Sequence, residues 1–111
     1  MTQNQAGNGG AIAANGSVTL IDSLIAGNLA TLDQGGGIQI WFGQLHAQGT
    51  RFSVNAAVNG GALLLRGSAA ELIDSSFDEN TASERGGAIA LYESAALQGS
   101  YLRFTDNHGG M

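Results

Sequence analysis

A repeat of 25–27 residues is the feature that most limits the folds open to this chain. Gly-Gly pairs recur four times in the 111 residues, each followed by a small residue and an aliphatic one. The pairs begin at Gly9, Gly35, Gly60 and Gly86. An asparagine recurs in phase with them, at Asn28, Asn55, Asn80 and Asn107. A large apolar residue stands three places before each asparagine, at Ile25, Phe52, Phe77 and Phe104. Two independent motifs that keep one period four times indicate a repeat architecture.

The apolar residues within each unit alternate, as Ile12 and Ala14 or Val18 and Leu20 do. A period of two predicts strands, and the runs are too short for helices. We expect three short strands per unit, which cannot bury an apolar face alone. Stacked about 4.8 Å apart on the next unit, they form parallel sheets around a continuous core. The sequence therefore predicts an all-β fold, a right-handed parallel β-helix of about four coils.

Each part of the repeat has a predicted role in this fold. The phenylalanines form an inward column that stacks from coil to coil. The asparagines lie at a sharp corner, where Asn tolerates left-handed backbone geometry and can join its amide to the next coil in a ladder. The Gly pairs turn the chain into the next strand, where a Cβ would clash. The competing leucine-rich repeat has a similar period, but it needs an L-x-x-L-x-L core and a helical segment that this sequence lacks.

Registering the four units predicts further columns. Two inward columns are expected at Val18, Leu45, Ala70 and Ala95, and at Leu20, Ala47, Leu72 and Leu97. A turn column follows at Asp22, Gly49, Asp74 and Gly99, and a hydroxyl column at Ser23, Thr50, Ser75 and Ser100. The last unit is longer, and we place a two-residue insertion at Tyr101–Leu102.

The composition of the chain argues against several classes of binding partner. A net charge of −5 with no lysine argues against nucleic acid or an anionic membrane surface, because both need a basic face. The first residues have neither the basic nor the apolar region of a signal peptide. No apolar run is long enough to span a bilayer, so we expect no direct insertion of this segment.

The glycine motif and F-x-x-N together resemble the repeats of the chlamydial polymorphic outer membrane proteins. The resemblance rests on GGAI (9–12, 86–89), GGAL (60–63), FSVN (52–55), FDEN (77–80) and FTDN (104–107), and GGGI (35–38) and IAGN (25–28) depart from it. It implies the β-helical passenger of an autotransporter, secreted or at the outer membrane and implicated in adhesion. Similar repeats occur in secreted proteins with pectin-lyase-like β-helices. A host-surface protein or a glycan is the partner that the resemblance implies.

Because β-helices also host polysaccharide lyases and hydrolases, an enzyme fragment whose catalytic coils lie elsewhere is the alternative. Asp22 and Asp74 share a column two coils apart, roughly 10 Å, beyond the range of about 6.5–9.5 Å for an inverting glycosidase. We interpret both as turn residues. His46 and His108 have no ligand partners at metal-binding spacing, so we predict no metal, and no cofactor motif occurs. The sequence therefore predicts no catalytic residues.

One outward column suggests binding. The residue after each inner aliphatic is Asn15, Trp41, Arg66 or Tyr92, and parity places them on the exterior of one sheet. Trp and Tyr beside Arg form planar surfaces that bind sugars or anchor a partner protein. The alternative is that these side chains shield the sheet or pack against a loop.

Residues 1–111 form one β-helix domain. No capping element is evident at either end, so we expect this domain to be a portion of a longer solenoid. Its exposed strand edges predict end-to-end self-association when it is expressed alone.

Overall fold

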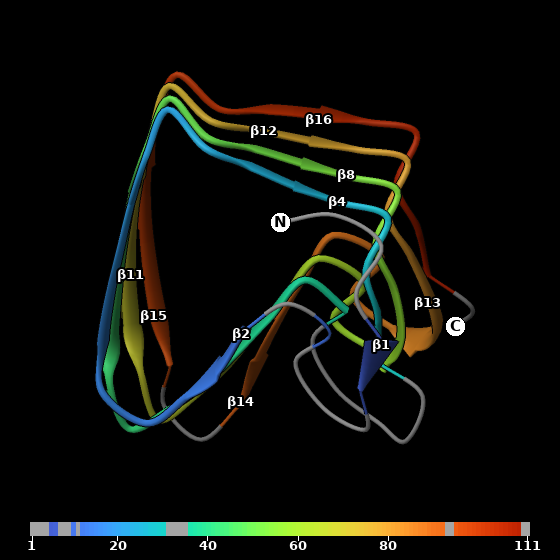
Figure 1. The fold of residues 1–111 in the computed structure, drawn as a ribbon, viewed down its shortest axis with the longest axis horizontal. Helices are drawn as coiled ribbons and strands as arrows, with labels where there is room; N and C mark the ends of the chain where they lie inside the picture. The colour runs from blue at the N-terminus through green and yellow to red at the C-terminus, as the bar shows by residue number, and fades with distance from the viewer. Residues whose placement is uncertain (1–4, 7–9, 11, 31–35, 93–94, 110–111) are drawn as a thin grey trace.

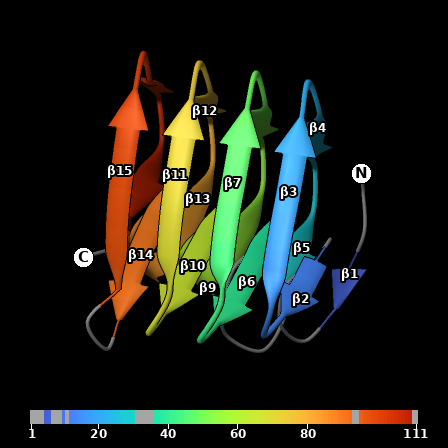
Figure 2. The same cartoon turned by 90° about the vertical axis from the view of Figure 1, so that its left-hand side faces the viewer.

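The computed structural model describes residues 5–6, 10, 12–30, 36–92 and 95–109. These residues form a right-handed parallel β-solenoid of about four coils, as the repeat predicts. The chain runs clockwise in Figure 1, and Figure 2 shows that each successive coil lies farther from the viewer of Figure 1. A clockwise path that recedes from the viewer is right-handed. Among the described residues there is no helix, and so none that could cross a membrane.

Each full coil contributes one strand to each of four parallel sheets, so the expectation of three strands per unit was wrong. The first sheet contains β2 (Ile12–Ala14), β6 (Ile38–Trp41), β10 (Leu63–Arg66) and β14 (Ile89–Tyr92). The second contains β3 (Ser17–Ile21), β7 (Gln44–Gln48), β11 (Ala69–Ile73) and β15 (Ala96–Ser100). The third contains β4 (Leu24–Ala26), β8 (Arg51–Ser53), β12 (Ser76–Asp78) and β16 (Arg103–Thr105). In Figure 1 the second sheet is on the left and the third is at the top.

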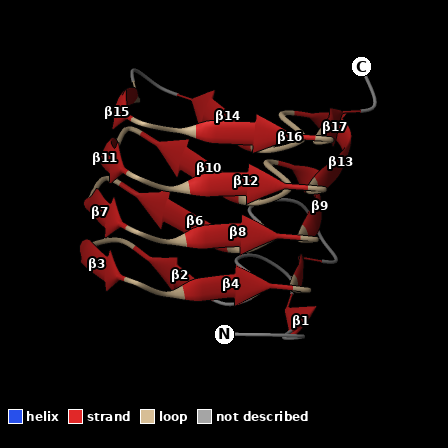
Figure 3. Cartoon of the chain, turned by 90° about the horizontal axis from the view of Figure 1, so that it is seen from above, coloured by secondary structure: helices blue, strands red, loops and turns tan. Residues whose placement is uncertain are grey.

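The fourth sheet, which the sequence pattern did not predict, follows the asparagine corner. It contains β1 (Gln5–Ala6), β5 (Leu29–Ala30), β9 (Ala56–Asn59), β13 (Thr81–Arg85) and β17 (His108–Gly109). All pairings between neighbouring strands are parallel, and the register shifts between Ala82 and Arg85. Figure 3 shows the strands of each sheet side by side along the solenoid.

The core is the predicted stack of inward columns. Phe52 and Phe77 are fully buried, and their rings stack with centroids 4.6 Å apart. Phe104 stacks on Phe77 at 5.0 Å, but it lies in the last coil and is 51% exposed. Ile25 continues this column below Phe52. The prediction that Phe77 is buried between the other two phenylalanines is therefore confirmed.

The asparagine ladder is also confirmed, and it is continuous through four coils. The backbone N–H and the Nδ2 of Asn28, Asn55 and Asn80 donate to the Oδ1 of the asparagine in the next coil, at 2.8–3.0 Å. The Nδ2 groups of Asn55, Asn80 and Asn107 also donate to a carbonyl of the preceding coil, as from Asn55 to Ile25. The ladder thereby satisfies polar groups that would otherwise be buried without partners.

The asparagines themselves are not left-handed, which corrects the sequence interpretation. The residue before each one takes the positive φ, at Gly27, Val54, Glu79 and Asp106. These four residues differ in type, so the corner has no sequence signature of its own.

The two glycines of each pair are needed for different reasons. Gly60 and Gly86, which begin their pairs, have φ of 65° and 64°, in the left-handed region that favours glycine. The second glycine lacks room: a Cβ on Gly61 would overlap the carbonyl oxygens of Gly87 and Thr81. Gly9 and Gly35 lie outside the described residues.

The register of the last coil differs from the prediction. Leu97, not Ala95, pairs with Ala70, and Gly99 pairs with Leu72. The turn column therefore ends at Tyr101, whose φ of 54° matches those of Asp22, Gly49 and Asp74. Ser100 pairs with Ile73 and does not extend the hydroxyl column. Relative to the preceding coil, one extra residue lies at the register shift between Ala82 and Arg85 and one lies between Tyr92 and Ala96, and none lies at Tyr101–Leu102.

Candidate functional site

The predicted exterior column lies on the outer face of the first sheet. Trp41, Arg66 and Tyr92 are direct neighbours on β6, β10 and β14. The Arg66 guanidinium carbon lies 5.7 Å from the centroid of the Tyr92 ring, within cation–π range. Trp41 is 42% exposed, whereas Arg66 and Tyr92 are half-buried. The structure thus brings the three predicted residues together, and Asn15 follows β2 in the adjacent coil.

In the neighbouring exterior column of the same sheet, Gln39, Leu64 and Ala90 are buried, whereas Ala13 of the first coil is exposed. The glycine-pair turns of the last two coils pack on Leu64 and Ala90. Gly60 lies so close to Leu64 that an added Cβ would stand 3.0 Å from the Leu64 Cβ. The glycine turns therefore cover this part of the sheet beside the Trp41 column.

A hollow of about 390 Å³ lies beside Trp41. It is lined by Ala13, Ala14, Asn15, Gln39 and Trp41. The indole stands beside a floor of small side chains and two side-chain amides. This arrangement can accept a flat, uncharged group on an aromatic surface.

Sequence reasoning missed Phe42, which follows Trp41 at the corner between the first and second sheets. Its side chain is 69% exposed and its φ is 49°. A second hollow, of about 560 Å³, is lined by Phe42 together with glycine, serine, alanine and glutamine residues. The only signal in the sequence is the aromatic pair itself, because a corner residue belongs to no alternating pattern.

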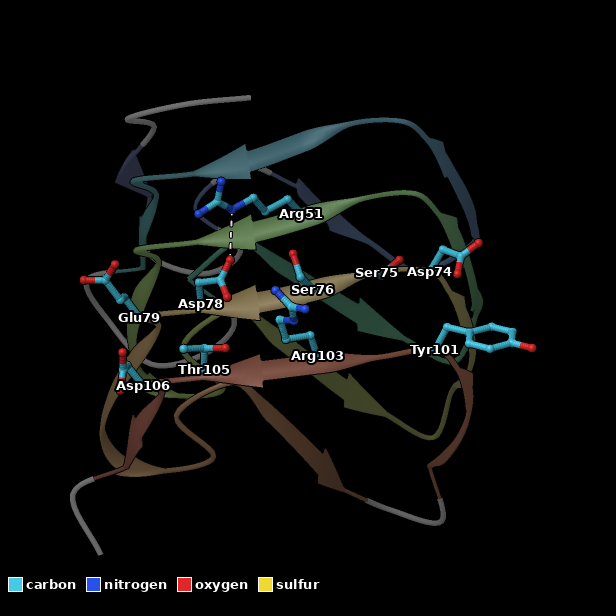
Figure 4. A pocket seen from close by; sticks show the side chains of 10 residues that line it. All are labelled: Arg51, Asp74, Ser75, Ser76, Asp78, Glu79, Tyr101, Arg103, Thr105 and Asp106. Carbon is cyan, nitrogen blue, oxygen red and sulfur yellow. Dashed lines mark hydrogen bonds and ion pairs between the residues drawn. The ribbon is translucent and has the colours of Figure 1, made fainter.

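A third hollow, of about 570 Å³, lies on the outer face of the third sheet (Figure 4). Arg51 and Arg103 come from the strands on either side of β12, and the Arg51 Nε donates to the Asp78 Oδ2 at 2.9 Å. Acidic residues stand at both corners, and Tyr101 points away from the other labelled side chains. Guanidinium, carboxylate and hydroxyl groups side by side can both donate to and accept from a hydroxyl-rich ligand.

The second sheet carries an outward histidine, as parity predicts. The His46 Nδ1 lies 2.8 Å from the Glu71 Oε1 of the next strand, and both side chains are well exposed. Asp22 and Asp74 occupy left-handed corner positions, in agreement with their interpretation as turn residues. The hydroxyls of Ser23, Thr50 and Ser75 donate to a backbone carbonyl two residues earlier in their own coils. Among the described residues no group of three or more His, Asp or Glu side chains is placed to hold a metal ion.

The four stacked parallel sheets define the class of protein, a parallel β-solenoid. Residues 74–92 match the family model of the Chlamydia polymorphic membrane protein repeat. The match spans FDEN and GGAI, and the other coils repeat the same columns, so the suspected resemblance to these repeats is confirmed. Comparison with curated proteins and with solved structures gives no match.

Proposed function

We propose that this chain is a non-enzymatic segment of a bacterial cell-surface or secreted β-solenoid, of the adhesin or autotransporter-passenger type. The matched repeat supports an outer-membrane or cell-surface protein. The observation that carries the binding role is the in-register column of Trp41, Arg66 and Tyr92 on one sheet.

A solenoid suits this role because its backbone fixes the positions of exterior side chains. Hydrogen-bonded strands hold neighbouring column members about 4.8 Å apart, so little conformational entropy is lost when a ligand spans them. Trp, Tyr and Arg are the residues most enriched at the energetic centres of interfaces. The partner class that this surface supports is a host-surface protein or a glycan.

Trp41→Ala is expected to abolish binding to host-cell surfaces while changing the free energy of unfolding by less than about 1 kcal/mol. Trp41 is 42% exposed and lies outside the core cluster. Binding of the labelled chain to cells, measured beside chemical denaturation, checks this prediction. Tyr101→Ala is the matched control, because Tyr101 is an exposed aromatic residue of the turn column, away from the Trp41 hollow, and should retain binding. Loss of stability with binding intact would instead assign Trp41 a structural role.

The alternative is a fragment of a polysaccharide-active enzyme. One observation favours it, the hollow of about 570 Å³ on the outer face of the third sheet. Its carboxylates and guanidiniums resemble the lining that a sugar polymer requires. In this hollow the Asp78 carboxylate forms an ion pair with Arg51. Depolymerisation of a polysaccharide by the purified chain, lost in Asp78→Asn, would replace the binding proposal with this one.

A further inference from the structure

Phe42 occupies a position that is unfavourable for its residue type. An L-residue with a side chain is strained at a φ of 49°, and a phenyl ring gains little when most of it faces water. The equivalent corner of the next coil contains Gly67, with φ of 58°. Both residues donate their N–H to a carbonyl of the following coil, Phe42 to Arg66 and Gly67 to Tyr92. The same corner position is therefore occupied by glycine in the third coil and by an exposed phenylalanine in the second.

Exposed residues with a side chain also occupy left-handed corners elsewhere, as Val54 and Tyr101 do, so Phe42 is singled out by its strain together with its aromatic neighbour and the hollows beside them. Trp41 and Phe42 are consecutive, and each lines one of the two hollows at this corner. The hollows adjoin in the first coil, where Asn15 lines one and Gly16 the other. We name the two hollows together, with Trp41 and Phe42, the aromatic corner.

The lining of the aromatic corner identifies the chemistry of its ligand. Among the residues that the structure describes, no charged side chain lines either hollow. Glycine, alanine and serine residues make up most of the rest of the lining, and the exposed residues Asn15 and Gln44 contribute side-chain amides. The described lining therefore offers no ion pair to a charged ligand. Aromatic faces attract the weakly positive C–H face of a sugar ring, and amides both donate to and accept from its hydroxyls.

We propose that the aromatic corner binds a neutral oligosaccharide, with one sugar ring on Trp41 and another on Phe42. This inference rests on the proposed function, since it names the ligand class of the surface that Trp41 belongs to. It extends that surface around the corner to Phe42, on the side of Trp41 away from the buried column of the first sheet.

The experiment uses Trp41 as its own reporter, because it is the only tryptophan in the chain. Neutral oligomers of glucose, galactose and N-acetylglucosamine are titrated into the intact chain, and Trp41 fluorescence is recorded. We expect a saturable change with at least one of them. Phe42→Gly and Phe42→Ala should each weaken this binding by at least about tenfold.

The Tm of Phe42 variants distinguishes a ligand-binding role of the Phe42 ring from a structural role. Phe42→Gly should raise Tm by a few degrees, because glycine relieves the left-handed strain, whereas Phe42→Ala should not. Val54→Gly is the matched control, since Val54 is also exposed at a positive φ but lies at the asparagine corner. It should raise Tm in the same way and leave the sugar affinity unchanged.

Three results would overturn the inference. One is parental affinity in Phe42→Gly, and another is binding restored by glycine but not by alanine, which would implicate the backbone. The third is the absence of a fluorescence change with every neutral sugar, while Trp41→Ala still abolishes cell binding. In that case the surface retains its proposed function, and its ligand belongs to another class, such as a protein.

Discussion

Phe77→Ala is expected to lower the free energy of unfolding by about 3–5 kcal/mol, as a large-to-small change in a closed core. The ring is fully buried and stacked on both faces, by Phe52 at 4.6 Å and by Phe104 at 5.0 Å. Its removal leaves a cavity that neither neighbour can fill without leaving its own coil. Chemical denaturation followed by circular dichroism measures the change.

Phe104→Ala provides the matched control within the same column. This ring stacks on one face only and is half-exposed, so its loss should cost less than half as much. Equal denaturation midpoints for Phe77→Ala and the parent chain would contradict the stacked core.

Gly61→Ala is expected to cost at least about 3 kcal/mol, because the added methyl group has no place to go. Its Cβ would overlap the carbonyl oxygens of Gly87 and Thr81, which are backbone atoms of the third and fourth coils and cannot rotate away. The third and fourth coils would have to separate locally, with loss of hydrogen bonds such as that from the Gly61 N–H to the Gly86 carbonyl. The denaturation midpoint and the amplitude of the far-ultraviolet signal measure the effect.

Gly16→Ala is the control for this second substitution. A Cβ on Gly16 meets no atom within 4 Å, so the free energy of unfolding should stay nearly unchanged. A folded Gly61→Ala variant with parental stability would mean that the coils pack less closely at the glycine pair than the structure indicates.

The stacking columns were readable from the sequence because a solenoid places identical side chains against each other. Phe77 stacks on Phe52, and the Asn55 side chain donates a hydrogen bond to the Asn80 side chain. Because each residue needs its own kind in the next coil, both motifs keep the same period along the sequence. The glycine pair is equally constrained, by φ at its first position and by space at its second. These requirements fix residue type at a given position, and a sequence pattern reveals them directly.

The register of the last coil could not be read in the same way. The prediction placed Ala95 and Leu97 where the structure places Leu97 and Gly99. A shift of two residues keeps every side chain on the same face of its strand, so alternation cannot detect it. The fourth sheet was missed for a related reason. Its strands range from two residues in β5 to five in β13, which is too variable for a period to emerge.

The candidate site was predicted in part. Alternation placed Trp41, Arg66 and Tyr92 on one exterior face, which follows from strand geometry alone. Phe42 could not be placed because its position depends on a left-handed corner whose occupants are chemically unlike, a phenylalanine in one coil and a glycine in the next. The hollows beside these aromatic residues depend on the small residues of neighbouring coils, which only the folded register brings together.

The direction of the hydrogen bonds between coils has a mechanical consequence. In every sheet these bonds run along the solenoid axis, and the two ends of the described chain lie at opposite ends of the stack (Figure 3). A force applied to the two ends therefore loads the bonds one after another, as in a zipper, and does not shear them all together. The terminal coil should peel away first, and each repeat of 25–27 residues should release about 80–100 Å of extended chain. Under tension this protein would lengthen in regular low-force steps, one for each coil.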